Sequence, residues 1–275
     1  MVVTEYRIKK SRVPTMKIAL VSDLHDRSPE KAITLLKRLK PDFVLVAGDL
    51  AERHEDGYVD WTIADLDRWQ GLSLRARIMS RTVKLIDGIL PLGQERTAWD
   101  EKNSRRFLRE VSEVAPIFFG IGNHEWYFTE KDMLLMEKCS VRLMDNEDTV
   151  YTLPGGQKIR IGALSTRRDM IWLRQFSRKP GFKILICHHP EYYGRYIRHT
   201  ELDTFDLIVS GHAHGGQWRI GGRGVLSPGQ GLFPKYAHGL YDGKLIVSAG
   251  LANTANIPRF GNPTEVVQIQ VLSEL

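Results

Sequence analysis

The 275-residue sequence is poor in cysteine and has no long apolar run and no internal repeat. Two cysteines, Cys139 and Cys187, are too few for a disulfide framework, so a reducing, cytoplasmic location is expected. No apolar run approaches the roughly 20 residues that a membrane-spanning helix needs, which excludes a bilayer-crossing chain. The N-terminus lacks the apolar segment of a secretory signal peptide. Without repeats, solenoids and propellers are also excluded.

The composition is that of a globular protein with an excess of positive charge. Hydrophobic residues make up 42% and charged residues 26%, which excludes disorder, collagen-like repeats and a coiled coil. Lysine and arginine number 39 against 33 acids, a net charge of +6. This excess favours anionic partners such as phosphorylated metabolites, nucleic acid or an acidic membrane surface. A solvated surface that charge keeps soluble explains it equally well.

Five short apolar runs, each followed by polar letters, predict strands that are buried on both faces. They lie at residues 16–25, 42–50, 115–125, 183–190 and 205–216. Residues 29–41 have apolar side chains at helical spacing and end in proline, so the first two runs and this helix predict a βαβ unit.

The second half is expected to be more antiparallel. Residues 149–153 and 158–163 flank Pro154-Gly155-Gly156 and predict a hairpin. Further short strands are expected at Val225 and at residues 236–241, 244–249 and 265–271, with Asp242-Gly243 as a tight turn. The predicted fold class is α/β, with two mixed β-sheets packed as a sandwich and flanked by helices. Residues 1–275 are predicted to form a single domain.

The connection between Asp49 and Asn123 is 73 residues long, which is far more than one crossover helix requires. We therefore predict a helical insertion at about residues 53–112, with helix over residues 60–90. Its second part, residues 72–86, mixes apolar side chains with Arg75, Arg77, Arg81 and Lys84. A basic amphipathic helix of this kind lies on a membrane surface or covers a phosphate-binding cleft. The alternative is a helical hairpin packed on the body with its cations in water.

Residues of types that commonly bind metal ions stand at the ends of the five predicted strands. These are Asp23, His25, Asp49, Asn123, His124, His188, His212 and His214. Any one of them alone could be a helix cap, a turn residue or a structural histidine. Because loops at the carboxyl ends of parallel strands converge on one crevice, we predict that these side chains meet there.

The ligand types and their number indicate two metal ions. Asp23 and His25 are two residues apart, as are His212 and His214, which puts each pair on one side of an extended segment. Carboxylate, imidazole and amide ligands suit Mn, Fe, Zn or Ni, and the absence of thiolates argues against a thiolate-selected site. Eight candidates are too many for one tetrahedral zinc but suit two ions sharing a bridging carboxylate, the arrangement that acts on phosphate esters.

These motifs resemble the five signature blocks of the calcineurin-like metallophosphoesterase superfamily. The blocks are Asp23-Leu24-His25, Gly48-Asp49, Gly122-Asn123-His124-Glu125, His188 and Gly211-His212-Ala213-His214, which span residues 16–216 in family order. The block that runs from His212 through Gly215-Gly216-Gln217, followed by residues 234–241, resembles one bacterial branch of the superfamily. That branch includes membrane-associated phosphoesterases and enzymes acting on lipid-linked phosphates.

The resemblance implies roles for the individual residues. Asp23, His25 and His214 would hold one divalent ion, Asp49 would bridge, and Asn123, His188 and His212 would hold the other. His188 is preferred to His189 because it directly follows the apolar run and stands two residues before Pro190. His124 would donate a proton to the leaving group or stabilise charge, or else orient a carboxylate. Glu52 departs from the family, where many members have aspartate, and its longer side chain is expected to alter the support of the site without removing a ligand.

The implied function is hydrolysis of phosphate mono- or diesters, lipid- or nucleotide-linked, by a hydroxide that two divalent ions activate, with manganese the favoured ion. The expected partners are a phosphorylated small molecule or lipid, with peripheral contact with an anionic membrane as a further expectation. A nuclease of the same superfamily and a non-catalytic metal-binding scaffold are the alternatives. Against the nuclease, no extended run of lysine and arginine is interleaved with aromatics. The natural substrate and the oligomeric state stay open.

Overall fold

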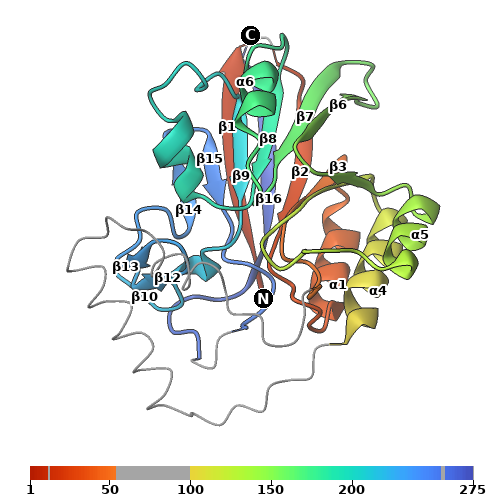
Figure 1. Ribbon diagram of the computed structural model, residues 1–275, viewed down its shortest axis with the longest axis vertical. Helices are drawn as coiled ribbons and strands as arrows, with labels where there is room; N and C mark the ends of the chain where they lie inside the picture. Colours follow the sequence, from red (N-terminus) through yellow and green to blue (C-terminus); the bar gives the residue numbers. More distant parts are fainter. Residues whose placement is uncertain (12, 54–99, 255–257, 275) are drawn as a thin grey trace.

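The computed structural model describes residues 1–11, 13–53, 100–254 and 258–274, which contain two six-stranded mixed sheets (Figure 1). The first has the strand order β1 (Val2–Ser11), β16 (Glu265–Glu274), β2 (Met16–Val21), β3 (Phe43–Ala47), β4 (Ile117–Gly120) and β5 (Arg142–Met144). The second has the order β14 (Gly239–Tyr241), β15 (Leu245–Val247), β9 (Leu207–Ser210), β8 (Lys183–Cys187), β7 (Lys158–Leu164) and β6 (Glu147–Thr152).

Helices cover the outer face of each sheet. The first sheet is covered by α1 (Glu30–Leu39), α4 (Glu101–Ser112) and α5 (Glu130–Lys138), whose buried side chains form one cluster with it. The second is covered by α6 (Met170–Ser177) and the turn η1 (Tyr193–Ile197). Two small hairpins, β10 (Arg219–Ile220) with β11 (Arg223–Gly224) and β12 (Leu226–Ser227) with β13 (Gly231–Leu232), follow the turn η2 (His214–Gly216).

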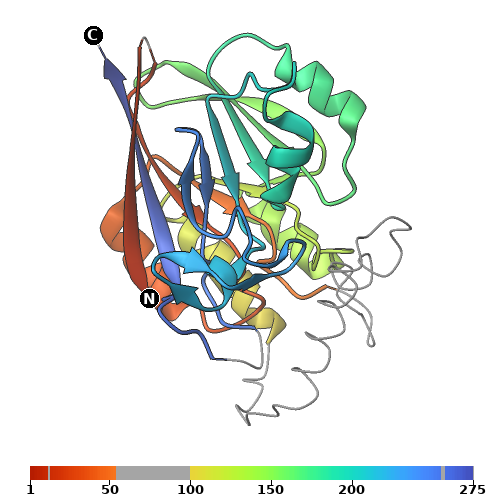
Figure 2. The same ribbon diagram turned by 90° about the vertical axis from the view of Figure 1, so that its left-hand side faces the viewer.

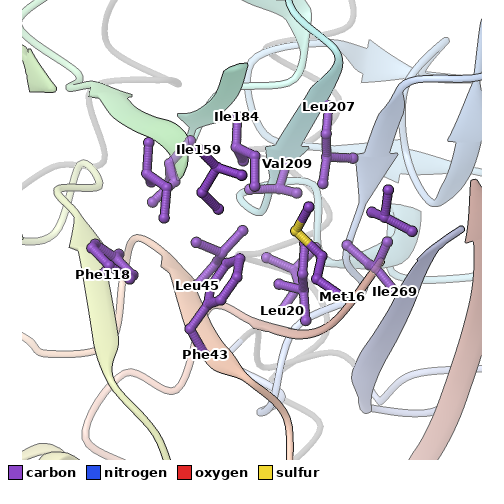
Figure 3. Packing of buried hydrophobic residues seen from close by; sticks show 14 of the residues in the cluster. Met16, Leu20, Phe43, Leu45, Phe118, Ile159, Ile184, Leu207, Val209 and Ile269 are labelled. Atoms are coloured by element: carbon purple, nitrogen blue, oxygen red, sulfur yellow. The ribbon is translucent and has the colours of Figure 1, made fainter. Parts of the chain in front are cut away.

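The central core lies between the two sheets, and the strand sequences explain why. Successive side chains of a strand point to opposite faces, so the side chains of a continuous apolar run pack into two core layers, one on each face of the sheet. In β2, Ile18 and Leu20 join the core between the sheets, whereas Ala19 and Val21 pack against the helices. Figure 3 shows Leu20 and Leu45 of the first sheet facing Ile184 and its neighbours on the second.

The predicted fold class is confirmed, and so are the βαβ unit β2–α1–β3 and the hairpin β6–β7. The expectation of an antiparallel second half is wrong for the middle of the second sheet. There β7, β8, β9 and β15 are all parallel, and only the edge strands β6 and β14 are antiparallel. The connections through α6 and η1 cross the outer face, so each following strand begins at the same end of the sheet. Val225 lies between strands and not in one.

The first strand was not anticipated from the sequence. It pairs in parallel with β16 over ten residues, from Val2 opposite Glu265 to Ser11 opposite Glu274, and Figure 2 shows the two strands side by side. Within the predicted insertion, the structure describes α4, whose N-cap Asp100 accepts a hydrogen bond from the Lys102 amide. The predicted helix over residues 60–90 lies outside the described residues and stays a prediction. None of the helices that the structure describes is long and apolar enough to cross a bilayer.

Candidate metal centre

The carboxyl ends of five strands meet at one end of the sandwich. The segments after β2, β3 and β4 carry acidic, amide and imidazole side chains, and those after β8 and β9 carry histidines. All eight residues predicted from the sequence come together there: Asp23, His25, Asp49, Asn123, His124, His188, His212 and His214. Six of them are almost fully buried, and His124 and His214 are partly exposed.

The backbone is shaped so that these side chains converge. Five of the residues adopt left-handed φ values between 46° and 64°, a region that Asp, Asn and His tolerate better than most residues: Asp23, His25, Asp49, His212 and His214. Two glycines permit the close approach of the loops. A Cβ atom at Gly48 would lie 2.5 Å from His188 Nδ1, and one at Gly122 would collide with the Asp49 carboxylate. Other residues at these positions would push the ligands apart.

Two groups of ligand atoms are close enough for each to hold a metal ion. In the first, His25 Nε2 and His214 Nε2 lie 4.0 and 3.8 Å from Asp23 Oδ1. In the second, Asp49, His188 and His212 present atoms that all lie within 4.8 Å of one another. Asn123 adds an oxygen to the second group, since its Oδ1 lies 2.9 Å from His188 Nε2.

Asp49 lies between the two groups. Its Oδ2 atom is 3.0 Å from His188 Nε2 on one side and 3.8 Å from His25 Nε2 on the other. Its Oδ1 atom accepts a 2.9 Å hydrogen bond from the backbone amide of His124, which holds the carboxylate in place. Burial acts to raise the pKa of Asp49, but the imidazoles of His188 and His124 hold that pKa well below its usual value.

The chemistry of the donor atoms fits divalent cations. The carbonyl of Ala47 lies 2.6 Å from His188 Nδ1, so Nδ1 carries a proton and Nε2 faces two oxygens, Asp49 Oδ2 and Asn123 Oδ1. Burial lowers the pKa of His188, but the neighbouring Asp49 outweighs burial and raises that pKa to about 9. The second group thus attracts positive charge.

The rings of His212 and His214 are suited to bind a metal ion in their neutral form. Burial holds the pKa of His212 and of His214 well below the usual value, so both rings keep a lone pair at neutral pH. The Nε2 atoms of His25 and His212 are buried and have no hydrogen-bond partner among the described residues. Buried nitrogens without a partner are costly unless a ligand satisfies them, which a metal ion at each group would do.

Glu52 connects both groups to His124. Its Oε1 lies 2.5 Å from His25 Nδ1 and its Oε2 lies 2.9 Å from His124 Nδ1. A carboxylate only accepts, so both Nδ1 atoms carry the proton and the two Nε2 atoms face the crevice. One side chain at this position therefore orients two histidines.

Two further residues that hold the site were given no role from the sequence. Glu125 is buried and accepts hydrogen bonds from the backbone amides of Asp49, Leu50, Ala51 and Gly122, tying the β3 loop to the β4 loop. Burial, together with the charge of Asp49, raises the pKa of Glu125 to about 7. The position of Glu125 directly after Asn123 and His124 was the feature of the sequence that could have indicated this role.

The second is Arg53, the largest fully buried side chain among the described residues. Its guanidinium donates to both carboxylate oxygens of Asp132 at 2.8 and 3.0 Å and to Asp26 Oδ2 at 2.7 Å. The same Asp26 oxygen accepts a 2.8 Å hydrogen bond from the backbone amide of Glu52. Arg53 thus fixes the segment that carries Glu52. Nothing in the local sequence distinguishes it from a solvated arginine.

His189 lies beside His212. Its Nε2 is 3.1 Å from Thr166 Oγ1, and its ring centroid is 4.2 Å from that of His212. Tyr192 stacks on its other side at 4.6 Å. Together with Glu191 and His212 it forms a further group of possible ligand atoms, which shares His212 with the second group.

Comparison with known proteins gives one family and two curated relatives. An uncharacterised protein of Bacillus subtilis, YpbG, is 28% identical over 165 residues, 58% of this chain and 61% of that protein. An uncharacterised metallophosphoesterase of Campylobacter jejuni, Cj0846, is 24% identical over 277 residues, 92% of this chain and 58% of that protein. This chain therefore spans less than two thirds of either relative.

Among solved structures, "Termus thermophilus Sulfate thiohydrolase SoxB in complex with glycerol" is 10% identical, with a TM-score of 0.45 over 89% of this chain and 52% of that one. The family model described as calcineurin-like phosphoesterase matches residues 16–216, a range that contains every residue of the two ligand groups. The chain belongs to the calcineurin-like phosphoesterase family.

Proposed function

We propose that this protein hydrolyses phosphate mono- or diesters with two divalent metal ions held at the two ligand groups. The observation that carries the proposal is the position of Asp49, whose Oδ2 atom faces His25 of one group and His188 of the other. Two divalent ions held by these residues would neutralise phosphate charge and lower the pKa of a bound water toward neutrality.

The proposed ligands of the first ion are Asp23, His25 and His214. Those of the second are Asn123, His188 and His212, with Asp49 shared between the two. Carboxylate, amide and imidazole ligands without thiolate suit manganese, which we propose as the working ion, with iron, zinc and nickel as alternatives.

His124 is the proposed general acid. Its Nε2 atom lies 3.9 Å from Asp49 Oδ2, which places the ring next to the shared ligand and beside the crevice. Glu52 accepts at its Nδ1 and stabilises the positively charged ring, so Nε2 can carry a proton to the leaving oxygen of the ester. The backbone amide of His124 fixes Asp49, so the acid and the shared ligand are positioned by one residue.

We further propose a lipid- or nucleotide-linked phosphate as the substrate class. This rests on the net charge of +6 and on the resemblance of the His212–Gln217 block to the bacterial branch with lipid-phosphate enzymes. A nuclease and a non-catalytic scaffold are the alternatives, and neither is better supported.

The test is hydrolysis of bis(p-nitrophenyl) phosphate and p-nitrophenyl phosphate by EDTA-treated protein to which Mn²⁺ is returned. Turnover is expected to appear only with metal and to be lost in Asp49→Asn. Glu113→Gln serves as the matched control, because it also replaces a carboxylate by an amide but at an exposed position. This variant should remain active. Equal turnover by Asp49→Asn, or no turnover of either ester at any metal concentration, would refute the proposal.

A further inference from the structure

A cluster of large apolar side chains is exposed on the small hairpins next to the metal centre. We call it the hairpin face, and it consists of Trp218, Ile220, Leu232, Phe233 and Phe260. Phe233 is 76% exposed, Phe260 69% and Ile220 66%. Exposed apolar residues scattered singly are ordinary, but a group of this size on one surface marks an interaction site.

Backbone hydrogen bonds hold the segments that carry these side chains next to one another. The amide of Arg219 donates to the carbonyl of Phe260, and that of Val225 donates to Trp218, each at 2.8 Å. The amide of Phe233 donates to Val225 at 2.8 Å, and Leu232 pairs with Leu226 across the β12–β13 hairpin. Figure 1 shows β10, β12 and β13 close together at one edge of the molecule.

The stretch of chain that carries the hairpin face is basic. Residues 212–264 contain a single acid, Asp242, whose carboxylate is paired with Arg198 at 2.6 Å. The same stretch supplies Arg219, Arg223 and Lys235 on and beside the hairpins, and the last two are exposed. This stretch therefore combines exposed apolar side chains with an excess of positive charge.

We propose that the hairpin face docks onto an anionic lipid bilayer. Aromatic rings settle at the boundary between headgroups and acyl chains, aliphatic side chains enter the apolar layer, and nearby cations meet lipid phosphates. A single-stranded nucleic acid would also suit aromatic rings and arginines. Ile220 and Leu232 favour the bilayer, because an aliphatic side chain offers a base no ring to stack upon.

Docking in this way would bring the crevice to the level of the lipid headgroups. The turn η2 leads from His214 directly to Trp218. A side chain added at Gly229, in the turn of the β12–β13 hairpin, would come within 3.3 Å of His212 Nε2. Access of the metal centre to lipid phosphates rests on the proposed function, but docking itself does not.

The experiment is flotation of the full chain with vesicles of phosphatidylcholine alone or with about 30% phosphatidylglycerol, at low and high salt. The protein is expected to float with the anionic vesicles at low salt, and high salt should weaken binding. Ile220→Ser/Phe233→Ser should reduce binding about tenfold or more, since two apolar side chains no longer enter the bilayer. Arg223→Gln/Lys235→Gln should reduce it about 30-fold, roughly fivefold for each cation.

Ile171→Ser is the matched control, because Ile171 is 74% exposed on α6, on the outer face of the second sheet. It should float as the unchanged protein does. Asp49→Asn should float normally as well, which separates docking from a failure of the proposed catalysis. Failure of the unchanged protein to float on anionic vesicles at low salt overturns the proposal. Equal flotation of the Ile220/Phe233 variant, or retention by single-stranded DNA without vesicle binding, overturns it too.

Discussion

Replacing Glu52 by glutamine tests whether one carboxylate orients two histidines. Glu52 accepts from His25 Nδ1 at 2.5 Å and from His124 Nδ1 at 2.9 Å. Glutamine has the same length but only one acceptor oxygen, so its amide group would face one of the two Nδ1–H donors. The loss of one hydrogen bond to a charged acceptor costs about 1.5–3 kcal/mol, which corresponds to roughly 10–100-fold in metal affinity or turnover.

Two measurements distinguish which histidine is released. If His25 loses its partner, metal content after dialysis against graded chelator should fall. If His124 does, metal content should hold while turnover of esters with poor leaving groups declines. Glu52→Asp is one methylene shorter and should keep only one of the two contacts, whereas the exposed Glu113→Gln should change neither measurement. Metal retention and turnover of Glu52→Gln both within twofold of the unchanged protein would refute this role for Glu52.

Further changes probe the proposed shared ligand, the proposed general acid and the buried arginine. Asp49→Ala should lose most of both ions by elemental analysis, since it contacts both ligand groups, and retention of two ions would contradict the bridging role. His124→Ala should keep its metal yet lose about 10²–10⁴-fold in turnover on poor leaving groups, and less with nitrophenolate, which needs little protonation. An equal loss for both leaving groups would favour charge stabilisation instead. Arg53→Met should lower the free energy of unfolding by about 3–5 kcal/mol in urea titrations, because it leaves Asp26 and Asp132 buried without their cation. Burial raises the pKa of Asp132, but Arg53 and the Thr129 hydroxyl hold it well below the usual value. The ionised form therefore stabilises the fold at neutral pH, and the difference between wild type and Asp132→Asn, measured with EDTA, should narrow as the pH falls below about 4.

The residues of the candidate metal centre were predictable because each follows an apolar run that is itself a local signal. β2, β3, β8 and β9 are buried on both faces. Each is therefore an almost uninterrupted apolar run in the sequence, and the end of the strand is easily recognised. Strand direction and partner are not local properties. β1 lies parallel to β16, some 263 residues away, and the direction of β9 depends on a connection that crosses the sheet. Apolar periodicity marks a strand but does not say which way it runs beside its neighbour.

The contacts that orient the ligands were out of reach of sequence reasoning, because they join residues far apart in the chain. Asp26 brings several of them together: it accepts from Arg53, from the Glu52 amide and from the Ser104 amide. Arg53 and Ser104 both belong to the predicted insertion at about residues 53–112, one just before residues 54–99 and the other shortly after them. Both are thus tied to the carboxylate that also holds the backbone of Glu52. Any change that displaces either residue therefore reaches Glu52 through Asp26, and through Glu52 it reaches His25 and His124.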